Sequence, residues 1–422
     1  MLTVANEPER AILVAVERHR TGAWGAEESL RELESLASTA GITVVGSAIQ
    51  AVKKPHPRTL IGAGKIEEIR GSVESLKAQV VVFDDELSPA QQRNLEQMFC
   101  VKVIDRTQLI LDIFAHRATS QEGKLQVELA QLQYLMPRLT RAWLHLSRQR
   151  GGGVGTRGPG ETQLEVDRRR VRERIAVLRK RLQEVRRTRA LHRVKRDAVP
   201  YPVVALVGYT NAGKSTLMNR LTDAGVLVEN KLFATLDPTV RTLRLPDGGE
   251  ALLVDTVGFI HKLPHDFVDA FKSTLDEVSN ASLLIHVVDG SEELAGERIS
   301  IVDGVLAELG AAETPRVTVF NKADRPRSQP LPRVDGAVCE ISAATGTGIG
   351  DLLRQIDGLL ASRQERMQVS IPVDRTDLIA AMHRGGRVVE ELLNEAQTRF
   401  QVTAFVPPPL AGRIRKELAE SC

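Results

Sequence analysis

The sequence predicts an α/β protein of several domains, because distinct patterns follow one another along its 422 residues. Residues 1–118 alternate strand-like apolar runs with helical patterns, which is typical of a small, mostly parallel α/β domain. Residues 119–197 carry two heptad-spaced apolar seams around a glycine-rich loop, which predicts a long antiparallel αα-hairpin. Residues 198–363 place a second glycine-rich loop between a strand and a helix, which predicts a P-loop domain with a mixed sheet and helices on both faces. Residues 364–422 read strand, helix, strand, with the helix expected at residues 378–396, and form a small C-terminal α/β domain.

The first domain carries one loop and one acidic cluster that need an interpretation. The loop Ile61-Gly62-Ala63-Gly64-Lys65 is superficially phosphate-binding, but it lacks the second spacing element and the Ser or Thr. We favour a tight βα turn over a nucleotide site at this position. Asp84, Asp85 and Glu86 close a strand, and we expect them in a solvated loop or as helix caps rather than as metal ligands.

The composition, 42% hydrophobic and 26% charged, is that of an ordinary soluble protein. The sequence has no apolar run of about 18 residues for a membrane span, and its N-terminus lacks a signal-peptide core. The three cysteines lack metal or disulfide spacing, so we expect a cytoplasmic protein without stable membrane insertion. Cys100 and Cys339 lie in apolar runs and are expected in the core.

The hairpin rests on two apolar seams. The first consists of Leu125, Leu129, Leu132, Met136, Leu139, Trp143 and Leu146, and the second of Leu164, Val171, Ile175, Leu178, Leu182 and Val185. Residues 148–161 form a Gly-rich tip, since glycines and Pro159 cannot continue a helix. A continuous second helix over residues 162–193 would be about 48 Å long. Pro137 is expected to kink the first helix.

The net charge of +3 conceals a strongly basic segment. Residues 138–196 contain 17 Arg and 2 Lys against 5 acidic residues, so the rest of the chain is acidic. This asymmetry favours RNA binding over a merely solvated helical face, and aromatic residues are too sparse there for sequence reading by stacking. We expect no DNA partner. The candidate RNA contacts are Arg148, Arg150, Arg157, Arg168, Arg169 and Arg170.

A P-loop follows the apolar run at residues 203–207. The loop GYTNAGKS fits G-x-x-x-x-G-K-[ST] and opens into a helical pattern. Lys214 is expected to reach the β- and γ-phosphates and Ser215 to bind Mg²⁺. The cofactor-binding residues predicted here are Gly208, Tyr209, Thr210, Asn211, Ala212, Gly213, Lys214, Ser215 and Thr216.

Two later segments have the character of nucleotide-dependent switches. Phe233, Ala234, Thr235, Leu236 and Asp237 lie in a polar, turn-rich stretch, where Thr235 is the candidate second Mg²⁺ ligand and Thr239 the fallback. Asp255, Thr256, Val257 and Gly258 follow a strand. Asp255 suits contact with Mg²⁺ through water, and Gly258 lets a backbone N–H approach the γ-phosphate. Lys214, Thr235 and Gly258 are therefore the catalytic candidates.

Base recognition is predicted at two further strand ends. Asn321, Lys322, Ala323 and Asp324 match N-K-x-D, and one carboxylate can accept hydrogen bonds from both N1–H and the 2-amino group of guanine. Ser342, Ala343 and Ala344 follow the next strand, where a backbone N–H can meet guanine O6. Because all these motifs occur in order, GTP is favoured over ATP.

Phe259 occupies the position where small signalling GTPases carry a Gln that orients the attacking water. Neither Phe259 nor Ile260 can hold water by hydrogen bonding, so unaided hydrolysis is expected to be slow. His261 and His265 lie nearby, but a solvated switch loop is the favoured interpretation for both. We therefore expect a partner that orders the switches or contributes a polar group.

The combination of the N-terminal domain, the tip GTRGPGETQLE, the P-loop, FATLDPT, DTVGF and NKAD resembles the HflX family of translation-associated GTPases. This resemblance implies binding to the large ribosomal subunit, stimulation of GTP hydrolysis by the ribosome, and splitting of stalled or stressed 70S particles. It also places a hydrophobic residue at Phe259. Asn211 resembles a P-loop Asn that coordinates a monovalent cation in related GTPases, so potassium joins GTP and Mg²⁺ as a candidate cofactor.

We interpret the chain as a monomeric, GTP-driven factor that inserts its basic hairpin into ribosomal RNA of the large subunit. One alternative is an ATP- or GTP-dependent RNA remodeller or large-subunit assembly factor. A second alternative is a non-ribosomal signalling GTPase whose hairpin is a coiled-coil docking arm.

Overall fold

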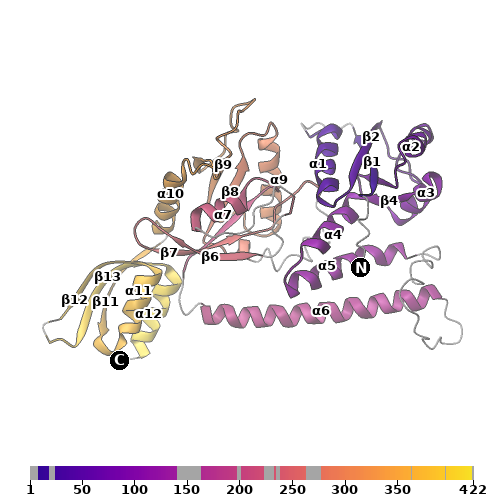
Figure 1. The fold of residues 1–422 in the computed structure, drawn as a ribbon. Helices are drawn as coiled ribbons and strands as arrows, with labels where there is room; N and C mark the ends of the chain where they lie inside the picture. The colour runs from indigo at the N-terminus through magenta and orange to yellow at the C-terminus, as the bar shows by residue number, and fades with distance from the viewer. Residues whose placement is uncertain are drawn as a thin grey trace, which may run out of the picture. The chain divides into compact units, whose positions relative to one another are not determined.

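The computed structural model describes residues 8–18, 24–139, 163–196, 201–222, 232–233, 238–262, 277–362, 364–394 and 396–420. The chain divides into two compact units (Figure 1). The first comprises residues 1–185 and 263–271, and the second comprises residues 186–262 and 272–422.

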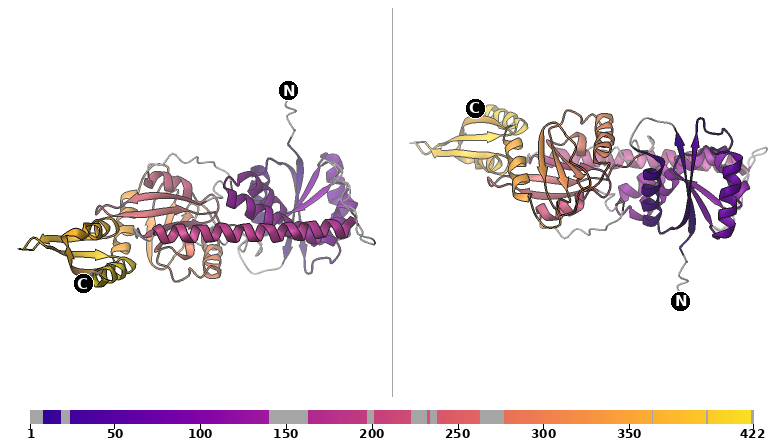
Figure 2. Two further views of the ribbon diagram at one scale, coloured as in Figure 1. Left: turned by 90° about the horizontal axis from the view of Figure 1, so that it is seen from below. Right: turned by 90° about the horizontal axis from the view of Figure 1, so that it is seen from above.

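The N-terminal domain is a four-stranded sheet with strand order β2-β1-β3-β4 and parallel pairing throughout. Its strands are β1 (Arg10–Arg18), β2 (Thr43–Val52), β3 (Val80–Phe83) and β4 (Lys102–Asp105). Its helices are α1 (Ala26–Thr39), α2 (Ala63–Ser75), α3 (Pro89–Phe99) and α4 (Arg106–Arg117). Helices cover both faces of the sheet (Figure 2), and each of the first three strands is followed by a helix that leads to the next parallel strand. The predicted parallel α/β domain is confirmed.

Two predictions within this domain are wrong. Asp84 and Asp85 are buried rather than solvated. Asp84 accepts a hydrogen bond from Arg106 Nη1 at 2.8 Å, and Arg106 also donates to Glu32. Cys100 is exposed rather than in the core, because it follows α3 in the left-handed conformation with φ of 56°.

The middle region pairs two helices, α5 (Gln121–Leu135) and α6 (Gln163–Arg196). Their predicted seams meet in one apolar cluster of Leu125, Leu129, Leu132, Met136, Val171, Ile175, Leu178 and Leu182. The helices run antiparallel, because Glu128 pairs with Arg174 whereas the later residue Leu139 accepts from the earlier Arg168. Pro137 does not kink α5, which ends at Leu135 and is followed by a 3-10 turn. The predicted tip, with Arg148, Arg150 and Arg157, lies outside the described residues, as do the seam residues Trp143 and Leu146.

The P-loop domain contains a six-stranded sheet of order β10-β9-β8-β5-β7-β6, in which β6 alone of these strands pairs antiparallel. The strands are β5 (Val203–Gly208), β6 (Thr239–Arg244), β7 (Glu250–Asp255), β8 (Leu283–Asp289), β9 (Arg316–Asn321) and β10 (Ala337–Glu340). The described helices are α7 (Lys214–Thr222), α9 (Ala295–Glu308) and α10 (Ile349–Ala361). Apolar clusters with α7 and α10 on one face and α9 on the other explain why β5, β8 and β9 are almost wholly buried. The predicted mixed sheet is confirmed.

The C-terminal domain differs in part from its predicted strand–helix–strand order. It contains β11 (Glu365–Pro372), α11 (Thr376–Gly385), β12 (Arg387–Leu393), β13 (Arg399–Val406) and α12 (Pro408–Glu420), with antiparallel strand order β11-β13-β12. The single helix predicted for residues 378–396 is wrong. A Cβ on Gly386 would lie 2.4 Å from the backbone oxygen of Phe405, so only glycine allows the chain to turn here and continue as a strand. None of the described helices combines the length and the apolar character needed to cross a lipid bilayer.

Candidate nucleotide-binding site

The P-loop joins the end of β5 to the start of α7, and close contacts require both of its glycines. A Cβ on Gly208 would lie 2.2 Å from the backbone oxygen of Val287, and one on Gly213 would lie 2.3 Å from Asn321 Nδ2. Gly208, Asn211 and Gly213 all have positive φ angles, of 149°, 60° and 96°. This curled backbone followed by a helix N-terminus is a binding site for a polyphosphate.

Lys214 is buried at the start of α7. Its Nζ donates to the backbone oxygens of Gly208 at 3.1 Å and Tyr209 at 2.9 Å. Burial lowers the pKa of Lys214 to about 8, although the nearby charge of Asp255 acts in the opposite direction. The loop therefore holds a desolvated cation whose charged form a bound phosphate would favour.

Ser215 and Asp255, the residues predicted to hold Mg²⁺, lie within hydrogen-bond distance of each other. Ser215 Oγ donates to Asp255 Oδ2 at 2.7 Å, because β7 lies beside β5 and ends where α7 begins. A hydroxyl and a carboxylate fit Mg²⁺, which keeps several waters and takes its other oxygens from phosphates. Among the described residues, no group of three or more His, Cys, Asp or Glu side chains is arranged to hold a metal ion.

The first predicted switch lies partly outside the described residues. Ala234, Thr235, Leu236 and Asp237 lie outside the described residues, so the role of Thr235 stays a prediction. Phe233 is buried with φ of 54°. Thr239 begins β6 and pairs in register with Asp255, which brings the fallback ligand to the same edge of the sheet.

The start of the second predicted switch is hydrogen-bonded to the P-loop backbone. Phe259 N–H donates to Gly208 O at 3.1 Å, and Thr210 N–H donates to Phe259 O at 2.8 Å. A Cβ on Gly258 would lie 2.8 Å from Thr210 Cα and 2.9 Å from Lys214 Nζ, so the site has room only for glycine. Thr256 anchors the same segment by donating its hydroxyl hydrogen to Leu206 O at 2.7 Å.

The Phe259 side chain is apolar and buried, so it offers no hydrogen bond to an attacking water. His261 is half-buried rather than solvated, which corrects the expectation for this residue, and His265 lies outside the described residues. Hydrophobic anchoring explains why an apolar residue follows Gly258.

The guanine loops are tied to the P-loop by Asn321. Its Nδ2 donates to Ala212 O at 2.9 Å, and its Oδ1 accepts from Ala343 N–H at 2.9 Å. Asp324 is left exposed for a base, and Ser342 Oγ donates to its Oδ1 at 2.5 Å. This hydrogen bond lowers the pKa of Asp324, which keeps the carboxylate ionised.

Two supporting residues were not identified from the sequence. Asp289, at the end of β8, pairs with Lys322 at 2.5 Å and accepts from Ser291 Oγ at 2.6 Å. Arg220 of α7 donates to the backbone oxygens of Ala343, at 3.1 Å, and Ala344. The strand-end position of Asp289 was a usable signal, whereas nothing in the sequence connects Arg220 with a loop 123 residues away.

The loop at residues 61–65 is built differently. Gly62 N–H donates to Gln50 Oε1 at 2.9 Å, and Lys65 pairs with Glu68 of its own helix at 2.7 Å. These contacts match the favoured interpretation of a turn that leads into α2.

A six-stranded sheet with one antiparallel strand, a P-loop that meets a glycine-bearing second switch, and an N-K-x-D loop bound to that P-loop define a P-loop GTPase. Family models agree along the chain. They are described as GTP-binding GTPase N-terminal for residues 27–115, GTP-binding GTPase Middle Region for residues 117–196, and 50S ribosome-binding GTPase for residues 203–322.

The similarity to known proteins extends over almost the whole chain. A GTPase HflX from Caldanaerobacter subterraneus subsp. tengcongensis is 49% identical over 98% of this chain and 95% of its own. One from Magnetococcus marinus is 46% identical over 99% and 97%. A crystal structure of a GTP-binding protein from Sulfolobus solfataricus in complex with GDP covers 84% of this chain and 99% of its own, at 24% identity and a TM-score of 0.44. The chain belongs to the HflX family of GTPases.

Proposed function

We propose that this protein binds the large ribosomal subunit through the basic α5–α6 hairpin and uses GTP to split or rescue stalled 70S ribosomes. The family model for residues 203–322, a 50S ribosome-binding GTPase, supports this partner. The observation that carries the proposal is the surface of α6, which is lined with arginines on the side away from its apolar seam.

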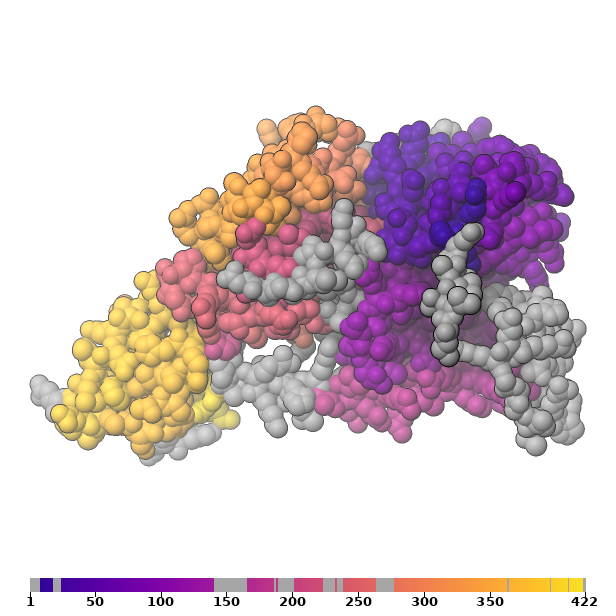
Figure 3. Space-filling model, in the orientation of Figure 1, coloured from indigo at the N-terminus to yellow at the C-terminus, as the bar shows by residue number. Residues whose placement is uncertain are grey.

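The exposed side of α6 offers a row of cations. Arg169, Arg170, Arg172, Arg179, Lys180, Arg181 and Arg187 are exposed, whereas Ile175, Leu178 and Leu182 are buried against α5. The helix lies along the lower edge of the first unit in Figure 3. Arg169 pairs with Glu173 at 3.9 Å and Arg170 with Asp167 at 4.0 Å along the same helix. Such a row suits the phosphates of structured RNA.

Arg168 has a different role from its two neighbours. It is half-buried, and its Nη2 donates to Leu139 O at 3.0 Å, which holds the start of α6 against the residue that follows the 3-10 turn after α5. We therefore propose Arg169 and Arg170 as RNA contacts and Arg168 as the residue that orients them.

GTP hydrolysis uses the site described above. Lys214 neutralises phosphate charge, the N–H of Gly258 meets the γ-phosphate, and Asp324 accepts from guanine. Mg²⁺, held by Ser215 and through water by Asp255, with Thr235 as the proposed further ligand, would neutralise the phosphate oxygens. Because Phe259 offers no hydrogen bond to water, the basal rate is slow and a ribosomal partner supplies or orders the missing polar group. A potassium ion bound at Asn211 is a further candidate for the group that promotes hydrolysis.

The proposed cycle couples this chemistry to the hairpin. GTP orders Thr235 and Gly258, and the hairpin is then held in an orientation that competes with subunit joining. Hydrolysis releases the switches and weakens the grip on the ribosome. Lys214→Ala should abolish nucleotide-dependent splitting while leaving part of the hairpin binding intact.

The test is GTP hydrolysis by the full chain alone and with small subunits, large subunits or 70S ribosomes, in potassium and in sodium buffers. We expect strong stimulation by large subunits and 70S particles and none by small subunits. A triple variant Arg179→Gln, Lys180→Gln and Arg181→Gln should lose stimulation with an unchanged basal rate. The control Arg354→Gln removes an exposed arginine from α10 and should retain full stimulation. A rate that no ribosomal particle changes would refute the ribosomal role and favour a signalling GTPase.

A further inference from the structure

Tyr209 lies in the P-loop, yet its side chain contacts the second switch. The ring is only 4% exposed, and its Oη accepts a hydrogen bond from the backbone N–H of His261 at 2.8 Å. We propose that Tyr209, held by Arg298 of α9, is a positioning residue that keeps Gly258 in place for the γ-phosphate. This inference depends on GTP binding and does not depend on the ribosomal partner.

The segment after Gly258 is held at two points in addition to this hydroxyl. Tyr209 and Phe259 form an isolated parallel bridge, in which Phe259 N–H donates to Gly208 O and Thr210 N–H donates to Phe259 O. These two bonds hold the residue after Gly258, and the Tyr209 hydroxyl holds the residue two positions further on. Without the hydroxyl, the segment keeps its bridge but loses the contact that stops it from pivoting about Phe259.

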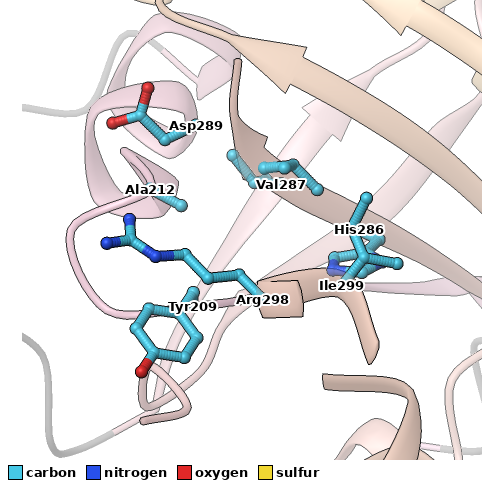
Figure 4. A pocket seen from close by; sticks show the side chains of 8 residues that line it. Tyr209, Ala212, His286, Val287, Asp289, Arg298 and Ile299 are labelled. Atoms are coloured by element: carbon cyan, nitrogen blue, oxygen red, sulfur yellow. The ribbon is translucent and has the colours of Figure 1, made fainter. Parts of the chain in front are cut away.

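Arg298 supports the ring of Tyr209 from α9. Its guanidinium carbon lies 5.0 Å from the ring centroid, within the range of a cation–π contact. Arg298 Nη1 lies 3.2 Å from Glu292 Oε1, which orients the guanidinium. Figure 4 shows the Arg298 side chain running toward the Tyr209 ring. Arg298, Tyr209 and His261 thus connect α9 to the second switch.

A small cavity beside the ring leaves little room for it to turn inward. The cavity measures about 10 Å³, room for at most one water molecule, and is lined by Tyr209, Arg298, His286 and Ile299 among others (Figure 4). Burial lowers the pKa of His286 to about 4, so this wall stays neutral at physiological pH. The ring is therefore confined between the cavity wall and the guanidinium, with its hydroxyl directed at His261.

A comparison of GTP binding with GDP binding distinguishes a positioning role of Tyr209 from a role in packing alone. Gly258 is expected to act on the γ-phosphate, which GDP lacks, so loss of positioning affects GTP alone. A residue that only packs the P-loop would affect both nucleotides. Tyr209→Phe keeps the ring and its packing and removes only the hydroxyl.

The experiment measures dissociation constants of fluorescent GDP and of a non-hydrolysable GTP analogue, together with kcat and KM for GTP, on the full chain. We expect Tyr209→Phe to weaken the GTP analogue about three- to tenfold, as for one lost hydrogen bond. GDP affinity should change less than about twofold, and kcat should fall. Arg298→Gln should act in the same direction, and the double variant should lose less than the sum of the two, because both residues act through one contact.

Tyr201→Phe is the matched control. Tyr201 lies just before β5, its hydroxyl bonds to Glu250, and its loss should leave both nucleotides unaffected. Equal weakening of GDP and GTP in Tyr209→Phe would reduce Tyr209 to a packing residue. Unchanged affinity and kcat, or tighter binding of the GTP analogue, would overturn the proposal.

Discussion

Asn321 donates its side-chain N–H to the backbone oxygen of Ala212 at 2.9 Å, across 109 positions of sequence. The first residue of the guanine motif is thus engaged in joining two loops. Asp324 of the same motif is exposed and accepts a hydrogen bond from Ser342. One short motif therefore supplies both a residue that joins the loops and the carboxylate predicted to read the base.

Asp324→Asn should change the base that is bound. An amide accepts from N1–H but donates where guanine also presents a donor, so GTP affinity should fall at least about 100-fold. Xanthine carries an oxygen at that position, so xanthosine triphosphate should bind better than GTP. Competition between the two nucleotides measures the exchange. If the variant still preferred GTP, Asp324 would not be the base-reading residue.

Gly258→Ala should abolish most GTP hydrolysis. The new methyl group would lie 2.8 Å from Thr210 Cα, so the second switch must move off the P-loop. We expect kcat to fall about 100-fold, while GDP binds nearly as before. Gly304→Ala is the control, because a Cβ at Gly304 in α9 has no neighbouring atom within 4 Å. Full activity in Gly258→Ala would contradict the close approach of this segment to the phosphates.

GTP affinity should fall as the pH rises through about 8. Burial lowers the pKa of Lys214 to about 8 without nucleotide, and bound phosphates favour the charged form and raise that pKa. Binding therefore takes up a proton above about pH 8 and none below about pH 7. Calorimetric titration at pH 8.5 in buffers of different ionisation enthalpy measures this uptake. Lys214→Arg keeps its charge and should take up no proton, so equal uptake in that variant would assign it to another group.

Arg106→Met should destabilise the N-terminal domain by about 3–5 kcal/mol. Arg106 is 2% exposed, and its removal leaves the buried carboxylates of Asp84 and Glu32 without their cation. Hydrogen exchange of the β1 and β3 amides measures this loss. Lys65→Met, which breaks the surface pair with Glu68, should cost less than about 1 kcal/mol. A comparable loss in both variants would mean that the buried network is not the source of stability.

Local patterns in the sequence determined much of the fold and of the candidate site. The alternation in residues 1–118, the seams of α5 and α6, and the motifs at Gly208, Asp255 and Asn321 are short-range signals, because helix and strand periods and turn glycines depend on neighbouring residues. The predicted type of element was wrong where two local preferences competed. Residues 387–393, for example, can form a helix or an edge strand. Pairing with β13 decided for the strand.

Only the tertiary structure decided which polar residues are buried and which loops meet. Asp84 follows an ordinary strand end, yet α4 places Arg106 beside it, and Arg220 of α7 reaches Ala343 in the loop that follows β10. In the same way, the P-loop motif accepts any residue at the position of Tyr209. Only the folded structure shows that this side chain contacts His261 and Arg298. Such contacts join residues tens to hundreds of positions apart. They depend on how complete elements pack together, which the spacing of residues along the chain does not encode.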